Sequence, residues 1–120
     1  MLFFYRGDRM SKGEMEDIIS RLITKWEKEY LGRGPLQVKT SILDHAVLVV
    51  LKGVLTPAEQ KISETESGLL SVKKIRAELV ESGADELKQI VSSATGMEIM
   101  SFHTDISTRT GERVMVFLMG

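Results

Sequence analysis

Two side chains capable of acid–base or metal chemistry stand close together near the end of the chain. His103 and Asp105 lie two positions apart in SFHTDISTRTGERVMVF, residues 101–117, and on an extended strand such side chains point to the same side. They could ligate a metal, or form a pair in which the carboxylate orients the imidazole. A metal site needs three or four ligands, and the other histidine, His45, falls in an expected turn. We therefore predict a polar strand face, with Asp105 beside Arg113, and no catalytic or metal site.

Hydroxyl and basic side chains follow this pair. They could form an anion cradle together with backbone N–H groups of a turn. The same residue types are typical of turns, where hydroxyls bond the nearby backbone and a glycine takes positive φ. We interpret them first as a turn and keep a ligand or partner surface as the alternative. The predicted binding or contact surface comprises His103, Asp105, Ser107, Thr108, Arg109, Thr110, Glu112 and Arg113, together with Arg33 and Lys52.

The spacing predicts a β-hairpin over residues 97–119. A three-residue loop, Arg109-Thr110-Gly111, would put the glycine in the left-handed region and pair Thr108 with Glu112. One face of this hairpin would carry Phe102, Thr104, Ile106, Val114, Val116 and Leu118. The other face would carry His103, Asp105, Ser107, Arg113, Met115 and Phe117.

An amphipathic helix is predicted over residues 12–31, with Gly32 or Gly34 ending it and Pro35 preventing its continuation. Ser11 is the expected N-cap. The expected inward face recurs at three- and four-residue spacing and comprises Met15, Ile18, Ile19, Leu22, Ile23, Trp26 and Tyr30.

A first hairpin follows, with Asp44-His45 as its two-residue turn. Pairing Leu43 with Ala46 puts one apolar row on a single face, namely Val38, Thr40, Ile42, Val47, Val49 and Leu51. Leu48 and Val50 occupy the opposite face of the second strand, which is therefore apolar on both sides and expected to be central in the sheet.

Strong helix signals come next. Thr56, Pro57 and Glu59 form an N-cap, a first-turn proline and a capping box. We expect this helix to pause near Ser67-Gly68, a kink at Gly83 and an end at Gly96. The expected inward residues of the longer helix are Val72, Ile75, Leu79, Leu87, Ile90 and Ala94.

These elements predict an α+β fold of two layers. A four-stranded, mainly antiparallel sheet of two hairpins would carry the helices on one face, in the order α-β-β-α-(α)-β-β. The second face would then hold an apolar stripe that is too large to leave in water. We predict that a second subunit or a partner covers this interface, which comprises Leu48, Val50, Met115 and Phe117.

The composition narrows the class of protein. The 120 residues suit one domain, over residues 11–120, and the absence of cysteine excludes disulfides and thiolate zinc sites and fits a reducing cytoplasm. The net charge of −1 implies no general affinity for polyanions. Lys73, Lys74 and Arg76 are followed by acidic residues and are expected to be a solvated helix face. No apolar run approaches the roughly 18 residues of a membrane span, so we expect no direct membrane insertion, and no cofactor is predicted.

Four phrases occur together in this chain: KWEKEYLGRGP, VVLKGVLTPAEQ, VKKIRAELVE and SFHTDISTRTGERVMVF. In this order and spacing they resemble the MpsC-type family of small bacterial proteins, formerly a domain of unknown function, over residues 14–118. The resemblance implies a link to a Na+-translocating, membrane-potential-generating system, and it brings no catalytic residues. The matching motif positions are Gly32, Arg33, Gly34, Pro35, Lys52, Gly53, Thr56, Pro57, Glu59, His103, Asp105, Ser107, Thr108, Thr110, Gly111, Glu112 and Arg113.

Residues 1–10 are expected to be a non-native or disordered tail outside this pattern. Arg6-Gly7-Asp8 can be encoded by AGA-GGT-GAT, which contains a bacterial ribosome-binding site, and Met10 follows at a workable distance. We hypothesise that Met10 is the native start, with a natural disordered tail as the alternative.

We predict a non-enzymatic accessory or regulatory protein. It would be a homodimer in the cytoplasm, peripheral to the inner face of the cell membrane, with a membrane-bound cation-translocating complex as its partner. The alternative is a dimeric module that binds a small ligand or anion through the hydroxyl-rich turn, His103, Arg109 and Arg113. Binding of nucleic acid is not expected, because a near-neutral chain with few aromatic residues lacks the usual surface.

Overall fold

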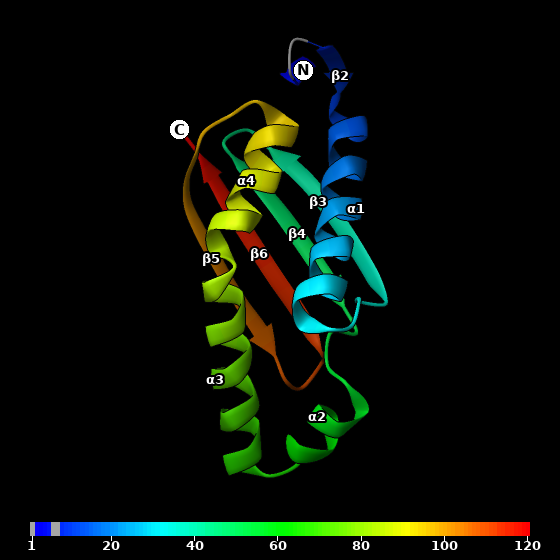
Figure 1. Cartoon of the computed structure of the whole chain (residues 1–120), viewed down its shortest axis with the longest axis vertical. Coiled ribbons are helices and arrows are strands. Elements are labelled where there is room, and N and C mark those ends of the chain that lie inside the picture. Colours follow the sequence, from blue (N-terminus) through cyan, green and yellow to red (C-terminus); the bar gives the residue numbers. More distant parts are fainter. Residues whose placement is uncertain (1, 6–7) are drawn as a thin grey trace.

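Figure 1 shows the computed structural model, which describes the backbone of residues 2–5 and 8–120 and the side chains from Met10 onward. The predicted α+β class and element order are confirmed. In chain order the elements are β1 (Leu2–Tyr5), β2 (Asp8–Ser11), α1 (Lys12–Leu31), β3 (Gln37–Leu43), β4 (Ala46–Lys52), α2 (Pro57–Ile62), α3 (Glu66–Ser82), α4 (Ala84–Thr95), β5 (Ile99–Ser107) and β6 (Glu112–Met119).

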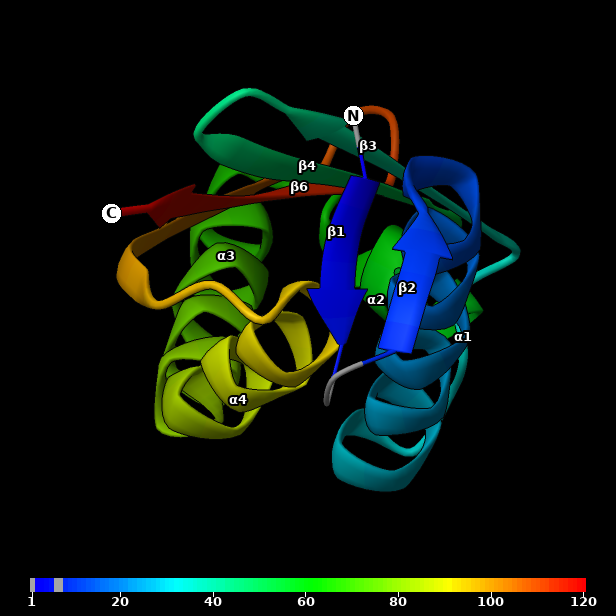
Figure 2. The same ribbon diagram turned by 90° about the horizontal axis from the view of Figure 1, so that it is seen from above.

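The main sheet joins the two hairpins through their inner strands. Its order is β3-β4-β6-β5, and every neighbouring pair is antiparallel. Figure 2 shows α1, α3 and α4 together on one face, which leaves the other face of the sheet uncovered within the described chain. β4 is central, as its two apolar faces predicted. None of the described helices has an apolar stretch long enough to cross a bilayer.

Helix α1 spans residues 12–31, as predicted. Ser11 and Glu14 form a reciprocal capping box, and Gly32 ends the helix at φ 83°, a conformation that costs glycine little. Two of the residues expected to face inward, Leu22 and Tyr30, are more than a third exposed. The buried stripe is therefore narrower than predicted, and it comprises Met15, Ile19, Ile23, Trp26 and Glu27.

The first hairpin and the following cap form as predicted. Leu43 pairs with Ala46 across the Asp44-His45 turn, so the apolar row from Val38 to Leu51 faces the helices. Thr56 caps α2 through a second capping box with Glu59.

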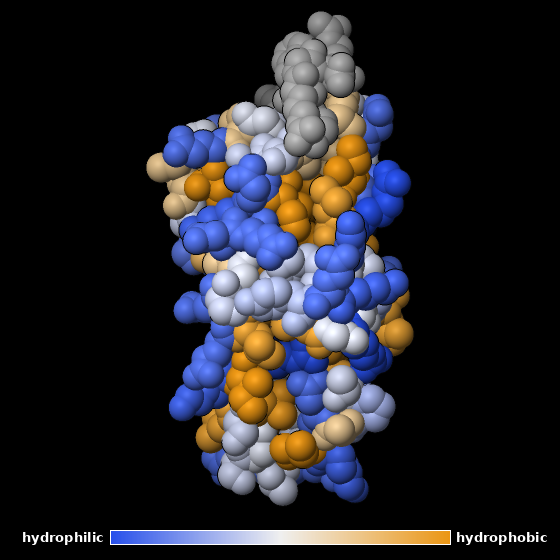
Figure 3. All heavy atoms as spheres, viewed as in Figure 1, coloured by the Kyte–Doolittle hydropathy of each residue, from blue (hydrophilic) through white to orange (hydrophobic). Residues whose placement is uncertain are grey.

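The boundary between α2 and α3 differs from the prediction. The pause falls at residues 63–65, because the Thr65 hydroxyl caps α3 by accepting from the Gly68 N–H at 3.1 Å. The inward face is also shifted: Val72, Arg76 and Val80 are buried, whereas Ile75 and Leu79 are exposed. Figure 3, which views the helix side, shows apolar side chains gathered at the surface of the lower half of the molecule, where α3 lies.

Gly83 ends α3 and begins α4, so the expected kink is a complete break. A Cβ atom at Gly83 would collide with the ring of Trp26, and glycine is therefore required for the close approach of α1 to this joint. Gly96 ends α4 in the left-handed region, as predicted.

The predicted register of the second hairpin is wrong by one residue. Ser107, rather than Thr108, pairs with Glu112. The loop has four residues because the Gly111 N–H bonds the Ser107 carbonyl at 2.8 Å and the Ser107 hydroxyl accepts from the Thr110 N–H at 3.2 Å.

A one-residue slip turns every side chain of one strand to the other face. Arg113, Met115 and Phe117 consequently lie in the core, each at most 1% exposed, instead of on the outer face. Phe102 stacks on Phe117 at 4.8 Å between ring centroids, which agrees with the observed register. The outer face of β6 carries Val114, Val116 and Leu118.

At the N-terminus, β1 and β2 form a separate antiparallel pair beside the start of α1. The predicted native start at Met10 and the predicted tail over residues 1–10 stay predictions, and residues 1, 6 and 7 lie outside the described residues.

Candidate functional site

The polar row predicted on β5 lies on the outer face, at the edge of the sheet. His103 Nε2 is 3.2 Å from Ser101 Oγ. Asp105 Oδ1 accepts from the Ile106 N–H at 2.8 Å and lies 3.8 Å from Lys73 Nζ. Asp105 therefore meets a lysine of α3, and its predicted position beside Arg113 on one strand face is wrong. Among the residues that the structure describes, no three His, Cys, Asp or Glu side chains gather as a metal site would require.

The hydroxyls of the β5–β6 turn bond the turn itself. Ser107 Oγ accepts from the Thr110 N–H, and Thr110 Oγ1 accepts from the Glu112 N–H at 3.3 Å. Gly111, at φ 73°, accepts from the Val54 N–H at 3.1 Å through its carbonyl, which fixes the turn against the loop that leads into α2. Thr108 and Arg109 line a shallow depression of about 340 Å³ between the turn and α2. These contacts are those of a structural turn.

Three other predicted site residues make side-chain contacts outside this turn. Lys52 and Glu112 form a cross-strand ion pair at 3.9 Å on the outer face. Arg33 donates to the Leu55 carbonyl at 2.7 Å and so fixes the loop that leads into α2. The structure thus distributes the predicted set over an edge strand, a turn, a loop and the core.

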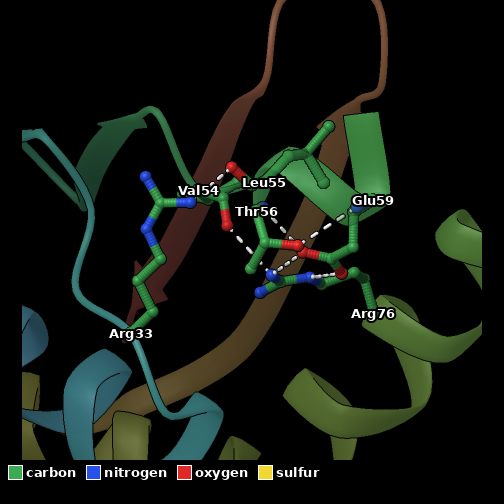
Figure 4. Close-up of polar contacts among 6 residues, drawn as sticks. All are labelled: Arg33, Val54, Leu55, Thr56, Glu59 and Arg76. Carbon is green, nitrogen blue, oxygen red and sulfur yellow. Dashed lines mark hydrogen bonds and ion pairs between the residues drawn. The ribbon is translucent and has the colours of Figure 1, made fainter. Parts of the chain in front are cut away.

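A buried ion pair between Arg76 and Glu59 holds α2 to α3, so the prediction that Arg76 belongs to a solvated helix face is wrong. Arg76 is 5% exposed, and its Nε and Nη2 atoms donate to Glu59 Oε2 and Oε1 at 2.8 and 2.5 Å. The same Nη2 atom donates to the Val54 carbonyl at 2.9 Å. Figure 4 shows Arg76 of α3 and Arg33 of the loop after α1 reaching neighbouring carbonyls of the same segment, those of Val54 and Leu55.

The capping carboxylate is strongly held in its charged form. Burial alone would raise the pKa of Glu59, but hydrogen bonds from Arg76 and from Thr56 outweigh burial and lower this pKa to about 2. Glu59 thus closes the capping box of α2 and neutralises Arg76 with one carboxylate.

A second acid–arginine pair lies inside the core, between α1 and the sheet. Glu27 and Arg113 are each 1% exposed. Arg113 Nη1 donates to Thr104 Oγ1 at 2.9 Å, whereas Arg113 Nε, Arg113 Nη2 and Glu27 Oε2 have no hydrogen-bond partner among the described protein atoms. Burial raises the pKa of Glu27 to about 7, against the opposing charges of Arg113 and Arg76. Burial also lowers the pKa of Arg113, and the charge of Glu27 opposes this shift.

This arrangement has two chemical capacities. A carboxyl with a pKa near 7 can exchange a proton at neutral pH. A guanidinium with two free donors can receive the two oxygens of a carboxylate or phosphate.

The spacing of Glu27 along α1 and of Arg76 along α3 is the signal that could have identified these buried charges. Glu27 follows Met15, Ile19 and Ile23 at four-residue intervals, and Arg76 stands midway between Val72 and Val80. A charged residue in phase with a buried apolar stripe indicates an internal charge.

Two relatives from Bacillus subtilis (strain 168) resemble the chain. This chain is 56% identical over 109 residues to "Uncharacterized protein YbcI", and the match covers 91% of this chain and 88% of the relative. The chain is 26% identical over 106 residues to "Uncharacterized protein YrhF", and the match covers 88% of this chain and 84% of the relative. No solved structure gives a significant match. The family model described as "Na+-translocating membrane potential-generating system (MpsC)" matches residues 11–120, and the chain therefore belongs to the MpsC family.

Proposed function

We propose that this chain is a non-enzymatic, soluble accessory or regulatory component of a cation-translocating system that generates a membrane potential. It acts in the cytoplasm as a homodimer, at the inner face of the membrane. The family description supports the link to such a system. The observation that supports an assembly role is the outer face of the sheet, which the described residues leave uncovered.

The centre of this outer face is apolar. Leu48 and Val50 of β4 lie beside Val114 and Val116 of β6, and Val114 and Leu118 are each 39% exposed. Charged side chains surround the apolar centre, namely Lys39, Lys52, Asp105 and Glu112. An apolar centre with a polar rim is the usual anatomy of a protein–protein interface.

The charges on the rim favour a second copy of the same chain as the occupant. Lys39 and Lys52 lie on the β3–β4 half, whereas Asp105 and Glu112 lie on the β5–β6 half. A two-fold axis parallel to the strands would bring the basic half of one copy opposite the acidic half of the other. Two sheets packed in this way keep their strands within about 30° of each other.

The dimer is tested by sedimentation velocity. Leu118→Lys places a charge in the apolar centre and is expected to give a monomer, because an unpaired charge is costly to bury. Leu70→Lys, at an exposed apolar position on α3, is the matched control and is expected to keep the wild-type mass. A wild-type chain that sediments as a monomer would contradict the dimer, as would a Leu118→Lys variant that stays dimeric.

The link to the membrane system is tested separately by cross-linking in native cells. We expect membrane subunits of a Na+-translocating system to be recovered with the chain and identified by mass spectrometry. Recovery of the chain alone or only with itself, while a known membrane complex is cross-linked in the same cells, would count against the accessory role.

A further inference from the structure

The two buried arginines use the same edge of the guanidinium differently. In Arg76, the Nε and Nη2 atoms donate hydrogen bonds to the two carboxylate oxygens of Glu59. In Arg113, the same two atoms have no hydrogen-bond partner among the described protein atoms, and only Nη1 is engaged, with Thr104. A buried guanidinium with an open edge is costly, because the lost hydration of a charge is not replaced.

Glu27 does not fill this edge. It is close enough to interact electrostatically with Arg113, yet its own Oε2 atom also lacks a hydrogen-bond partner. Since burial holds the pKa of Glu27 near 7, this carboxyl neutralises Arg113 only in part at neutral pH.

Arg113 also lines a groove between α3 and β5, with a volume of about 280 Å³. Thr104, the hydroxyl partner of Arg113, lines the same groove. Lys73 and Lys74 of α3 contribute positive charge, and Asp105 and Glu81 contribute negative charge. Lys73 lies 3.8 Å from Asp105, so these two charges neutralise each other. Two positive charges, on Lys74 and the buried Arg113, then remain in the groove against one negative charge, on Glu81.

We infer that this groove binds a small oxyanion, a carboxylate or a phosphate group, with Lys74 at the rim and with the Nε and Nη2 atoms of Arg113 as donors, which are buried in this structure and must turn toward the groove to reach the anion. Two parallel donors match the two oxygens of such an anion, in the manner that Arg76 and Glu59 display within the same molecule. The volume lies just below the range of pockets for drug-sized ligands, which suits a small molecule. This site is independent of the proposed accessory role.

The experiment is a calorimetric titration of the full chain with inorganic phosphate and, separately, with succinate. Sodium chloride keeps the ionic strength constant, so that general screening does not change. Binding of either probe at up to about 10 mM is the expected result. Binding of phosphate alone assigns a phosphate-bearing ligand, and binding of succinate alone assigns a carboxylate-bearing one. Failure of both probes to bind overturns the inference.

Variants locate the site. Arg113→Lys keeps a positive charge but removes the two-donor edge, and it is expected to weaken binding at least about tenfold. Arg109→Lys makes the same change in the β5–β6 turn, outside this groove, and is expected to leave the affinity unchanged. Equal affinity of Arg113→Lys and wild type overturns the proposal.

Two further measurements apply if Arg113→Lys does not fold. Lys74→Gln, at an exposed position, is expected to weaken binding about threefold. In the wild type, the Nε–H resonance of Arg113 is expected to move on addition of the bound anion. An anion that binds without moving this resonance lies elsewhere and overturns the assignment.

Discussion

Two carboxylates within the helix layer face buried arginines and reach opposite states. Glu59 accepts two hydrogen bonds from Arg76, and its pKa is lowered to about 2. Glu27 lies near Arg113 and Arg76, but Oε2 accepts no hydrogen bond from the described residues, and burial raises its pKa to about 7. The comparison teaches that a nearby positive charge does not keep a buried carboxyl ionised unless donors point at its oxygens.

The largest expected effect comes from breaking the satisfied pair. Arg76→Met should lower the free energy of unfolding by about 3 kcal/mol, since it removes three hydrogen bonds and leaves Glu59 Oε2 and the Val54 carbonyl without the donors that Arg76 supplies. Urea unfolding followed by Trp26 fluorescence measures this loss. Arg21→Met, which removes an exposed ion pair to Asp17, is the control and should cost less than about 0.5 kcal/mol. Equal losses in the two variants would show that burial gives the Arg76 pair no special importance.

The second effect concerns the pH dependence of stability. Between its ordinary value of 4.5 and its folded value of about 7, Glu27 binds more protons in the folded chain than in the unfolded chain. Its contribution to stability is therefore complete below pH 4.5 and is lost as the pH rises through 7. From pH 5 to pH 8 this loss should amount to about 2 kcal/mol.

Glu27→Gln should abolish this loss, and urea unfolding at both pH values measures it. Glu29→Gln, at an exposed position on the same helix, is the matched control, and its free energy of unfolding should change with pH as that of the wild type does. If the free energy of unfolding changed with pH in the same way in the wild type and in Glu27→Gln, the raised pKa of Glu27 would be disproved. Glu59 acts in the opposite sense: its contribution is present above pH 4.5 and is lost as the pH falls toward 2.

A smaller loss of stability is expected when the hydroxyl that accepts a hydrogen bond from Arg113 is removed. Thr104→Val removes the acceptor of Arg113 Nη1 and should cost about 1.5 kcal/mol, because a buried charged donor loses its partner. Thr24→Val is a suitable control, since the Thr24 hydroxyl donates to the Ser20 carbonyl inside α1. A Thr104→Val variant that loses no more stability than Thr24→Val would mean that the Arg113 contact contributes little.

The smallest effect should come from the exposed pair at the groove. Lys73 and Asp105 are 41% and 78% exposed, so Lys73→Gln should change the free energy of unfolding by less than about 0.5 kcal/mol. The same urea titration measures it. A loss comparable to that of Arg76→Met would remove the distinction between buried and exposed pairs in this chain.

The elements that the sequence predicted well are those with local signals. Ser11 with Glu14, and Thr56 with Glu59, are capping boxes that fix two helix starts by themselves. The first hairpin follows from one apolar row and a two-residue turn.

The second hairpin lacked such a signal. From Val114 to Leu118 every residue of β6 is apolar, so the pattern fits either register equally well. The register is set by the contacts of Ser107, Gly111 and Val54, and Val54 lies outside the hairpin, in the loop between β4 and α2. Because the apolar pattern leaves the register open, the sequence does not predict that Arg113 lies in the core with two guanidinium nitrogens that lack a hydrogen-bond partner among the described residues.

Gly83 has a consequence for observing this molecule in solution. The chain has a single tryptophan, and its ring fills the space where a side chain at the joint of α3 and α4 would stand. The indole also stacks on Tyr30 and donates to Glu86 of α4 at 3.3 Å. Any event that alters the angle between these two helices must displace the indole. The protein thus carries an intrinsic optical probe at this joint, and no label is needed to follow its movement.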